Sequence, residues 1–168
     1  LGEDTAAGLV YLYGLDPALR EDVAVVHWKY WGIDQIDPDY GDHAKTKVYG
    51  RDGNDLPGTW MDYDGDGDDD ERHYHVYPGQ MVQLEITLEN NGASLQRNVL
   101  VRFYFSDDSS IHDDDIALYG GVAPDLGRND VYTTRYFVRV PINVTIGRQH
   151  WIGVIVDTEN FIDEQVEW

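Results

Sequence analysis

The sequence predicts an all-β protein folded as an antiparallel β-sandwich, and three observations lead to this class. The first is the alternation over residues 82–88, whose apolar positions are Val82, Leu84, Ile86 and Leu88. A period of two is typical of a strand with one buried face, which leaves Gln83, Glu85 and Thr87 on a wet face. The second observation is the series of apolar runs that follow. The third is the set of Gly, Asn and Asp turns between these runs. Short strands at this spacing indicate a sandwich.

Each strand has its own signal in the sequence. Residues 22–31 are rich in β-branched and aromatic side chains and predict the opening strand. After 82–88, turned by Asn90-Asn91-Gly92, strands are expected at 98–106, at 131–140 and at 150–156, and a short apolar piece at 116–118 follows the first of these. The last of these strands has Ile152, Val154 and Val156 on one face.

An insertion at about 32–77 separates the first two long strands. Short strand candidates at 46–49, 59–63 and 73–77 lie between Gly, Pro, Asn and Asp turns. The insertion is therefore predicted to be a small, β-rich and acidic flap or an elaborated edge of the sheet.

Residues 1–20 stand apart as an N-terminal arm or linker, and two conformations fit them. Ala and Leu in residues 4–14, with Gly14 at the end, favour a short helix. Alternation at Ala7, Leu9, Tyr11 and Tyr13 instead favours an apolar strand. A strand of this kind can pack on its own domain or add to a sheet edge of a neighbouring molecule.

Charge and composition exclude several classes of function. The chain has 32 acidic and 12 basic residues and a formal charge of −20, so nucleic acid and anionic membranes are poor partners, while cations are good ones. The same charge also fits the solvated surface of a protein from a salty habitat. There is no cysteine. No stretch approaches the roughly 20 apolar residues of a spanning helix, and no signal peptide is recognisable, so we expect no membrane insertion.

Catalysis has little support in the sequence. No serine lies in a Gly-x-Ser-x-Gly elbow, no glycine loop is suited to phosphate, and no His-Glu-x-x-His is present. We therefore expect no enzyme, no catalytic residue and no organic cofactor.

The sharpest candidate site is the acidic stretch 62–71. It opens as Asp-x-Asp-x-Asp-Gly, which brings carboxylates to one side of a turn, as calcium loops do. The twelfth position is His73 rather than Glu, so the closing ligand has to come from another acidic residue. The predicted calcium ligands of this loop are Asp62, Asp64, Asp66, Asp68, Asp70 and Glu71. The alternative is a solvated acidic turn.

A second acidic loop follows the strand 98–106. Asp107, Asp113 and Asp115 are its candidate calcium ligands. Asp also caps and turns chains without any metal, and that interpretation stays open here. Ca²⁺ is the one cofactor that the sequence suggests.

Several short motifs resemble a known family. They are Pro78-Gly79, the strand that ends at Asn91-Gly92, Phe-Tyr-Phe-Ser-Asp-Asp at 103–108 with Asp115 behind it, and Val-Asp…Asn…Ile…Glu over 156–164. Together they resemble the bacterial cell-adhesion-related domain (CARDB), an immunoglobulin-like module, over residues 21–168. The resemblance implies a secreted or cell-surface adhesion or spacer module, whose partners are other extracellular proteins or copies of itself.

Two other functions stay open. If the N-terminal strand docks into the next copy, the contact does not close, and a head-to-tail homopolymer or filament results. Residues 4–14 also look like the closing helix of a matrixin-type metalloprotease, which implies an accessory tail of a secreted hydrolase. Such a tail could bind polysaccharide through exposed aromatic side chains, although a sandwich also uses aromatic residues in its core.

Overall fold

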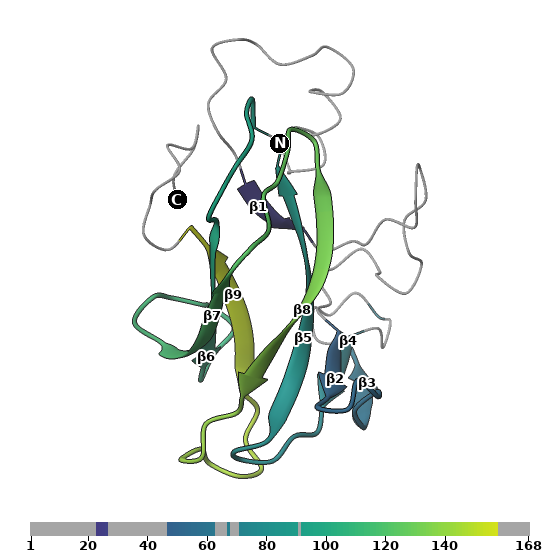
Figure 1. Cartoon of the computed structure of the whole chain (residues 1–168). Coiled ribbons are helices and arrows are strands. Elements are labelled where there is room, and N and C mark those ends of the chain that lie inside the picture. Colours follow the sequence, from purple (N-terminus) through teal and green to yellow (C-terminus); the bar gives the residue numbers. More distant parts are fainter. Residues whose placement is uncertain (1–22, 27–46, 63–66, 68–70, 91, 158–168) are drawn as a thin grey trace.

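A computed structural model describes residues 23–26, 47–62, 67, 71–90 and 92–157 (Figure 1). This part of the chain contains nine strands and no helix. The strands are β1 (Val23–Val26), β2 (Val48–Gly50), β3 (Gly58–Met61), β4 (Glu71–Tyr74), β5 (Met81–Asn90), β6 (Leu100–Ser106), β7 (Ile116–Val122), β8 (Val131–Arg139) and β9 (Trp151–Val156). The all-β class predicted from the sequence is confirmed.

The first sheet is built around β5. β8 pairs antiparallel with β5 over nearly its whole length, from Met81↔Arg139 to Glu89↔Val131. β1 and β2 also pair antiparallel with β5, β1 near its C-terminal end and β2 near its N-terminal end. Because β8 covers one edge of β5 along its length, β1 and β2 share the other edge. β2 comes from the predicted insertion, so that part of the insertion elaborates the main sheet.

The second sheet has the order β7-β6-β9, and both of its pairings are antiparallel. The register between β6 and β7 shifts near Arg102 and Tyr104, which marks a β-bulge. Figure 1 shows this sheet facing the first one, and the chain therefore has two layers. β7 begins with the short apolar piece 116–118, which was not predicted as a strand from the sequence, and extends to Val122.

The core lies between the two sheets. The apolar face of β5, predicted from the sequence, is fully buried: Val82, Leu84, Ile86 and Leu88. Across from it, β6 contributes Val101 and Phe103, and β9 contributes Ile152, Val154 and Val156 as predicted. The Phe103 ring lies 5.4 Å from the ring of Tyr136 on β8, so aromatic packing links the two sheets.

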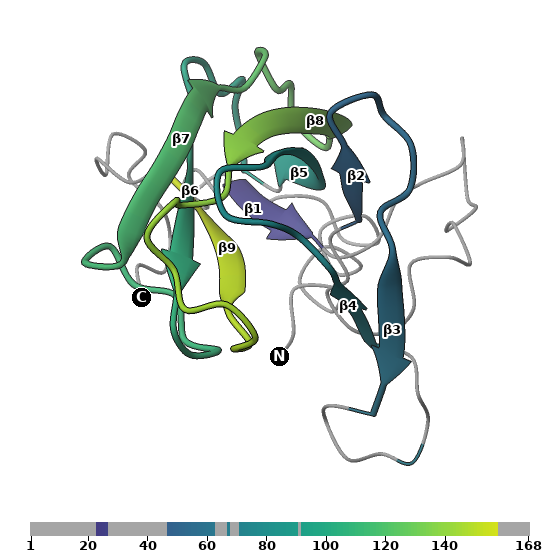
Figure 2. The same cartoon turned by 90° about the horizontal axis from the view of Figure 1, so that it is seen from below.

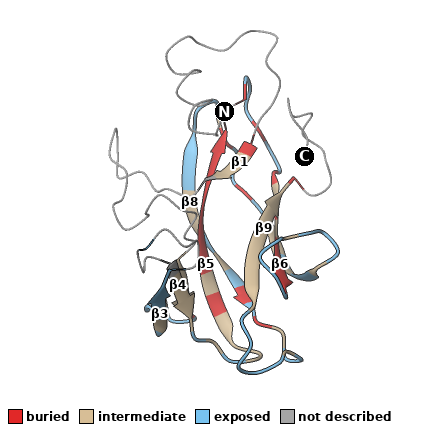
Figure 3. Cartoon of the chain, turned by 180° about the vertical axis from the view of Figure 1, so that it is seen from behind, coloured by how far each residue is buried: buried red, intermediate tan, exposed pale blue. Residues whose placement is uncertain are grey.

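Most of the polar face of β5 is buried as well, so the predicted wet face is wrong, and Gln83 at one end of this face is half-buried. Glu85, Thr87 and Glu89 are 3%, 0% and 7% exposed, and Figure 3 shows β5 buried along most of its length. The physical reason is the central position of β5. Strands on both of its edges carry side chains over its outer face, and alternation within one strand does not reveal its neighbours.

Cross-strand pairs satisfy the polar groups of this outer face. Arg135 lies directly opposite Glu85, and its Nε donates to Glu85 Oε2 at 2.7 Å. The Arg135 guanidinium lies 3.6 Å from the ring centroid of Tyr49 on β2. Burial, and then the negative charge of Glu85, raises the pKa of the Tyr49 phenol. A layer of Tyr49, Arg135 and Glu85 therefore joins three strands across the sheet.

A two-stranded ribbon, β3 paired with β4, stands beside the sandwich (Figure 2). The Arg72 guanidinium lies between two rings, 5.6 Å from the centroid of Trp60 and 5.3 Å from that of Tyr74. Its Nη2 also donates to the Leu56 carbonyl at 2.8 Å. These contacts join the ribbon to the chain that leaves β2.

Several predictions lie outside the described residues. They include both conformations of the N-terminal arm 1–20 and most of the predicted opening strand, of which Val23–Val26 is confirmed. Within the described part of the chain, no helix has the length and hydropathy that a membrane span requires.

The packing of β5 leads to a prediction about stability. Leu84 is 2% exposed, so Leu84→Ala removes buried methyl groups and leaves a cavity, and we expect a loss of about 2–5 kcal/mol in the free energy of unfolding. Urea denaturation measures this loss. Ile146→Ala is the matched control, since Ile146 is 84% exposed and its truncation is expected to cost little. Similar small losses at both positions would contradict the described core.

Candidate functional site

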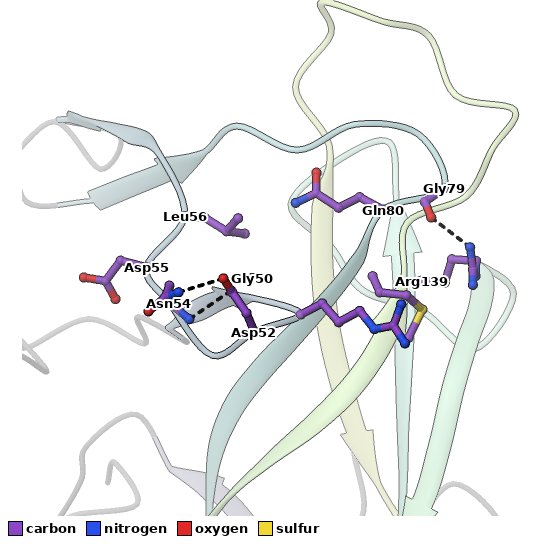
Figure 4. Close-up of a pocket in the computed structure, with 10 residues that line it drawn as sticks. Gly50, Asp52, Asn54, Asp55, Leu56, Gly79, Gln80 and Arg139 are labelled. Carbon is purple, nitrogen blue, oxygen red and sulfur yellow. Dashed lines mark hydrogen bonds between the residues drawn. The ribbon is translucent and has the colours of Figure 1, made fainter.

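A cleft of about 790 Å³ opens where the turn after β2 faces the turn before β5 (Figure 4). The end of β8 completes it. Its lining is polar apart from Leu56 and Met81, and it consists of Gly50, Arg51, Asp52, Asn54, Asp55, Leu56, Gly79, Gln80, Met81 and Arg139.

The first wall of the cleft is the turn 50–55. Gly53 N donates to the Gly50 carbonyl at 2.9 Å, and Gly53 has a φ of +82°, which favours glycine. Gln83 on β5 holds this turn against the sheet, because its Nε2 donates to the carbonyls of Gly50 and Arg51 at 3.3 and 3.0 Å. The turn is thus fixed by its own hydrogen bonds and by the central strand.

Asp52 and Asn54 form a polar pair on this wall. Asn54 Nδ2 donates to Asp52 Oδ2 at 2.7 Å, and Asn54 N donates to Asp52 Oδ1 at 3.2 Å. These two hydrogen bonds favour the ionised form and lower the pKa of the Asp52 carboxyl. The wall therefore carries a carboxylate that stays charged at mildly acidic pH.

The second wall is the turn 77–80 together with the end of β8. Gln80 N donates to the Tyr77 carbonyl at 3.0 Å, and Tyr77 N donates to Gln80 Oε1 at 2.9 Å. Gly79 has a φ of +77°. Arg139 Nη1 donates to the Gly79 carbonyl at 3.0 Å, which places the guanidinium at the mouth of the turn.

Some arginines of the described residues pair with carboxylates and others do not, and the two cleft arginines belong to the second group together with Arg72 and Arg128. Arg97, Arg135 and Arg148 each lie within 4 Å of a carboxylate, at 3.4, 2.7 and 3.6 Å. In the described part of the chain, no carboxylate forms an ion pair with Arg51 or Arg139. The cleft therefore presents one guanidinium group from each wall, Arg51 from the turn 50–55 and Arg139 from the end of β8, together with the acceptors of Asp52 and Asn54.

The first predicted calcium loop is described only in part. Asp62 is exposed, and its Oδ2 accepts a hydrogen bond from Gly67 N at 3.2 Å. Gly67 has a φ of +104°, so the chain folds back on Asp62 there. The other predicted ligands of this loop, Asp64, Asp66, Asp68, Asp70 and the side chain of Glu71, lie outside the described residues.

The second predicted calcium loop shows other contacts. Asp107 lies 3.6 Å from Arg148 Nη1 and 2.8 Å from His150 Nδ1. The His150 contact is close but not aligned as a hydrogen bond, since Nδ1 has no hydrogen-bond partner. Asp115 Oδ2 accepts from His112 N at 2.8 Å, and Asp113 is exposed.

The second loop is not assembled as a metal centre: among the described residues, no three His, Asp or Glu side chains lie close enough to hold one ion together. Most of the first loop lies outside those residues. Calcium at these loops stays a prediction. The sequence did not indicate the cleft, because its polar residues are separated in the chain. The scarcity of basic residues and the Gly-rich turn at 50–53 were the available signals.

Fold and site together define a module of two antiparallel sheets with an open polar cleft at one end. Residues 68–168 match the family model of CARDB, and the chain belongs to that family. CARDB is a family of non-enzymatic, adhesion-related domains that are typical of extracellular and surface proteins. No curated protein and no solved structure matches the chain. The resemblance of residues 4–14 to a matrixin helix, and with it the hydrolase-tail hypothesis, lies outside the described residues.

The Asp52–Asn54 pair predicts a pH effect. Asn54→Ala removes the hydrogen bond from Nδ2, so the pKa of Asp52 is expected to rise toward its ordinary value. With a lowered pKa in the folded state, Asp52 adds stability above its unfolded pKa, and this stability is lost as pH falls through the folded pKa. NMR titration of the carboxyl carbon measures the shift, with Asn143→Ala as control. An unchanged Asp52 titration in Asn54→Ala would refute this account of the turn.

Proposed function

We propose that the chain is a non-catalytic adhesion or spacer module of a secreted or cell-surface protein. The observation that carries this proposal is membership of the CARDB family over residues 68–168. The two-layer fold supports it, because a sandwich with its core between the sheets leaves turns and loops free for contacts.

Binding of the isolated chain to surfaces tests this function. The fluorescently labelled chain is mixed with intact cells of the source organism and with cells whose surface proteins and polysaccharides have been stripped enzymatically. Saturable binding to intact cells that unlabelled chain displaces is expected, with a loss on stripping. Binding to neither preparation, or equal unsaturable binding to both, would contradict an adhesion role.

Calcium stabilisation is a second part of the proposal. The contact between Asp62 and Gly67 supports it, because it is the kind of fold-back that an Asp-x-Asp-x-Asp-Gly loop makes around an ion. The proposed ligands are those predicted in both acidic loops. Like charges so close together repel one another unless a cation lies among them.

Thermal unfolding tests the calcium proposal. A ligand that binds only the folded state stabilises it by mass action, so calcium is expected to raise Tm and EDTA to lower it. Sodium at matched ionic strength is the control for screening of the −20 charge. Asp62→Asn is expected to reduce the calcium effect, while Asp125→Asn, outside both loops, is expected to leave it unchanged. An equal rise with sodium would exclude the loop as a calcium site.

A filament subunit is the second candidate function, and the sheet edges favour it. β7 and β8 each pair on one side only within the described residues. Neither strand contains Asp or Glu, although the chain has 32 acidic residues. β7 carries no charged residue, whereas β8 carries Arg135 and Arg139, so β7 is the edge more open to pairing with a strand of another copy. Light scattering of the full chain beside a version that starts at Asp16 tests this candidate: polymers that persist without residues 1–15 would exclude strand donation by the N-terminus.

A further inference from the structure

We propose that the cleft between the turns 50–55 and 77–80 binds a uronic acid residue of a polysaccharide, a sugar ring that carries one carboxylate. This inference rests on the proposed adhesion function and adds to it the chemistry of the partner. Three features of the cleft support it: two guanidinium groups without a carboxylate partner, the acceptors of the turn 50–55, and room for a sugar ring.

Guanidinium groups without a carboxylate partner favour the binding of an anion. With 32 acidic and 12 basic residues, an arginine of this chain has carboxylates in excess to pair with. Arg51 and Arg139 nevertheless line one cleft, and within the described residues neither is paired with a carboxylate. Arg139 gives Nη1 to the Gly79 carbonyl, which leaves most of its five N–H donors for a ligand. A guanidinium binds a carboxylate through two parallel hydrogen bonds.

The acceptors of the turn 50–55 suit hydroxyl groups. Asp52 carries carboxylate oxygens that act only as acceptors when ionised. Asn54 uses two of the acceptor positions of Asp52, and a carboxylate has about four. Ring hydroxyl groups of a sugar can donate to these oxygens. Figure 4 shows Asn54 and Asp55 on one side of the cleft and Gln80 and Arg139 on the other.

Gln80 adds a hydrogen-bond donor to the guanidinium groups and the carboxylate acceptors. Its Oε1 is engaged by Tyr77 N, so the amide orientation is fixed and Nε2 is left to donate to a hydroxyl or ring oxygen. Leu56 and Met81 give the lining an apolar part for the C–H face of a ring. The cleft is open to solvent, and its volume of about 790 Å³ leaves room for a sugar ring at the surface.

A uronate uses both the guanidinium donors and the acceptors, whereas the simpler ligands use one of the two. A neutral sugar would satisfy the acceptors and leave the two guanidinium groups unpaired. An acidic peptide would pair the arginines and bring further carboxylates toward Asp52 and Asp55. Because the ring hydroxyls and the carboxylate lie on one residue, a uronate matches both kinds of group at once.

The net charge of the chain sets the conditions of the test. A charge of −20 repels a polyuronate at long range, which slows association at low salt. At about 0.15 M salt the Debye length is about 8 Å, so distant carboxylates are screened, while direct guanidinium contacts are screened much less. Binding is therefore measured near this ionic strength.

Calorimetric titration of the full chain with defined oligosaccharides tests the proposal. The probes are hexagalacturonate and hexamannuronate, with fully methyl-esterified hexagalacturonate and hexaglutamate as matched ligands that lack the charge or the sugar ring. We expect at least one uronate to bind, and the ester and the peptide to bind about tenfold or more weakly, because each lacks one half of the contacts. R51Q and R139Q are expected to weaken uronate binding similarly, and R97Q, whose arginine pairs with Asp125 outside the cleft, to leave it unchanged.

Other outcomes overturn the proposal. They are no binding of either uronate at millimolar concentration, equal binding of hexaglutamate, an equal effect of R97Q, or uronate binding that survives both R51Q and R139Q. A further alternative is that calcium bridges the uronate to acidic side chains. Titrations with calcium and with EDTA, with folding checked by circular dichroism, identify this case. Binding that requires calcium and does not depend on the arginines would also overturn the proposal. Cell binding without uronate binding would leave the adhesion function standing and reject this ligand. Uronate binding without cell binding would support this ligand and contradict the adhesion function.

Discussion

The burial of β5 on both faces is the constraint on which the rest of the structure depends. Its apolar side chains pack between the sheets, while Glu85 and Thr87 are enclosed on the outer face. A carboxylate enclosed in this way needs a partner, and Arg135 on β8 supplies a hydrogen bond of 2.7 Å directly opposite. Burial and polar pairing thus fix the same strand register, because a slip by one residue would bring Glu85 toward the core.

The cleft follows from this arrangement. Gln83 on β5 anchors the turn after β2, and backbone hydrogen bonds join Gly79 and Gln80 to Val140 at the end of β8. Both walls are therefore tied to the ends of strands that the core holds rigidly. The backbone of both turns and the side chains of Gln80 and Arg139 are thus held in place without a ligand, which lowers the cost of ordering them on binding.

Much of the fold could be predicted from the sequence, because period-two alternation and β-branched runs reflect local structure directly. The apolar face of β5, the strand β8 and the face of Ile152, Val154 and Val156 on β9 were all found in this way. The outer face of β5 was not, since its burial comes from Arg135, about 50 residues away in the chain. The cleft escaped prediction for the same reason. Arg51 and Arg139 meet only through pairings of β2 and β8 with β5, which no local pattern encodes.

Native-state hydrogen exchange of the backbone amides tests the central role of β5 most directly. If β5 holds both sheets and both walls of the cleft, its amides and those of β8 paired with it are expected to exchange only through global unfolding. The amides of the β3–β4 ribbon are expected to exchange by local opening, at a lower free energy. Exchange from β5 that is as fast as exchange from β3 and β4 would contradict this account.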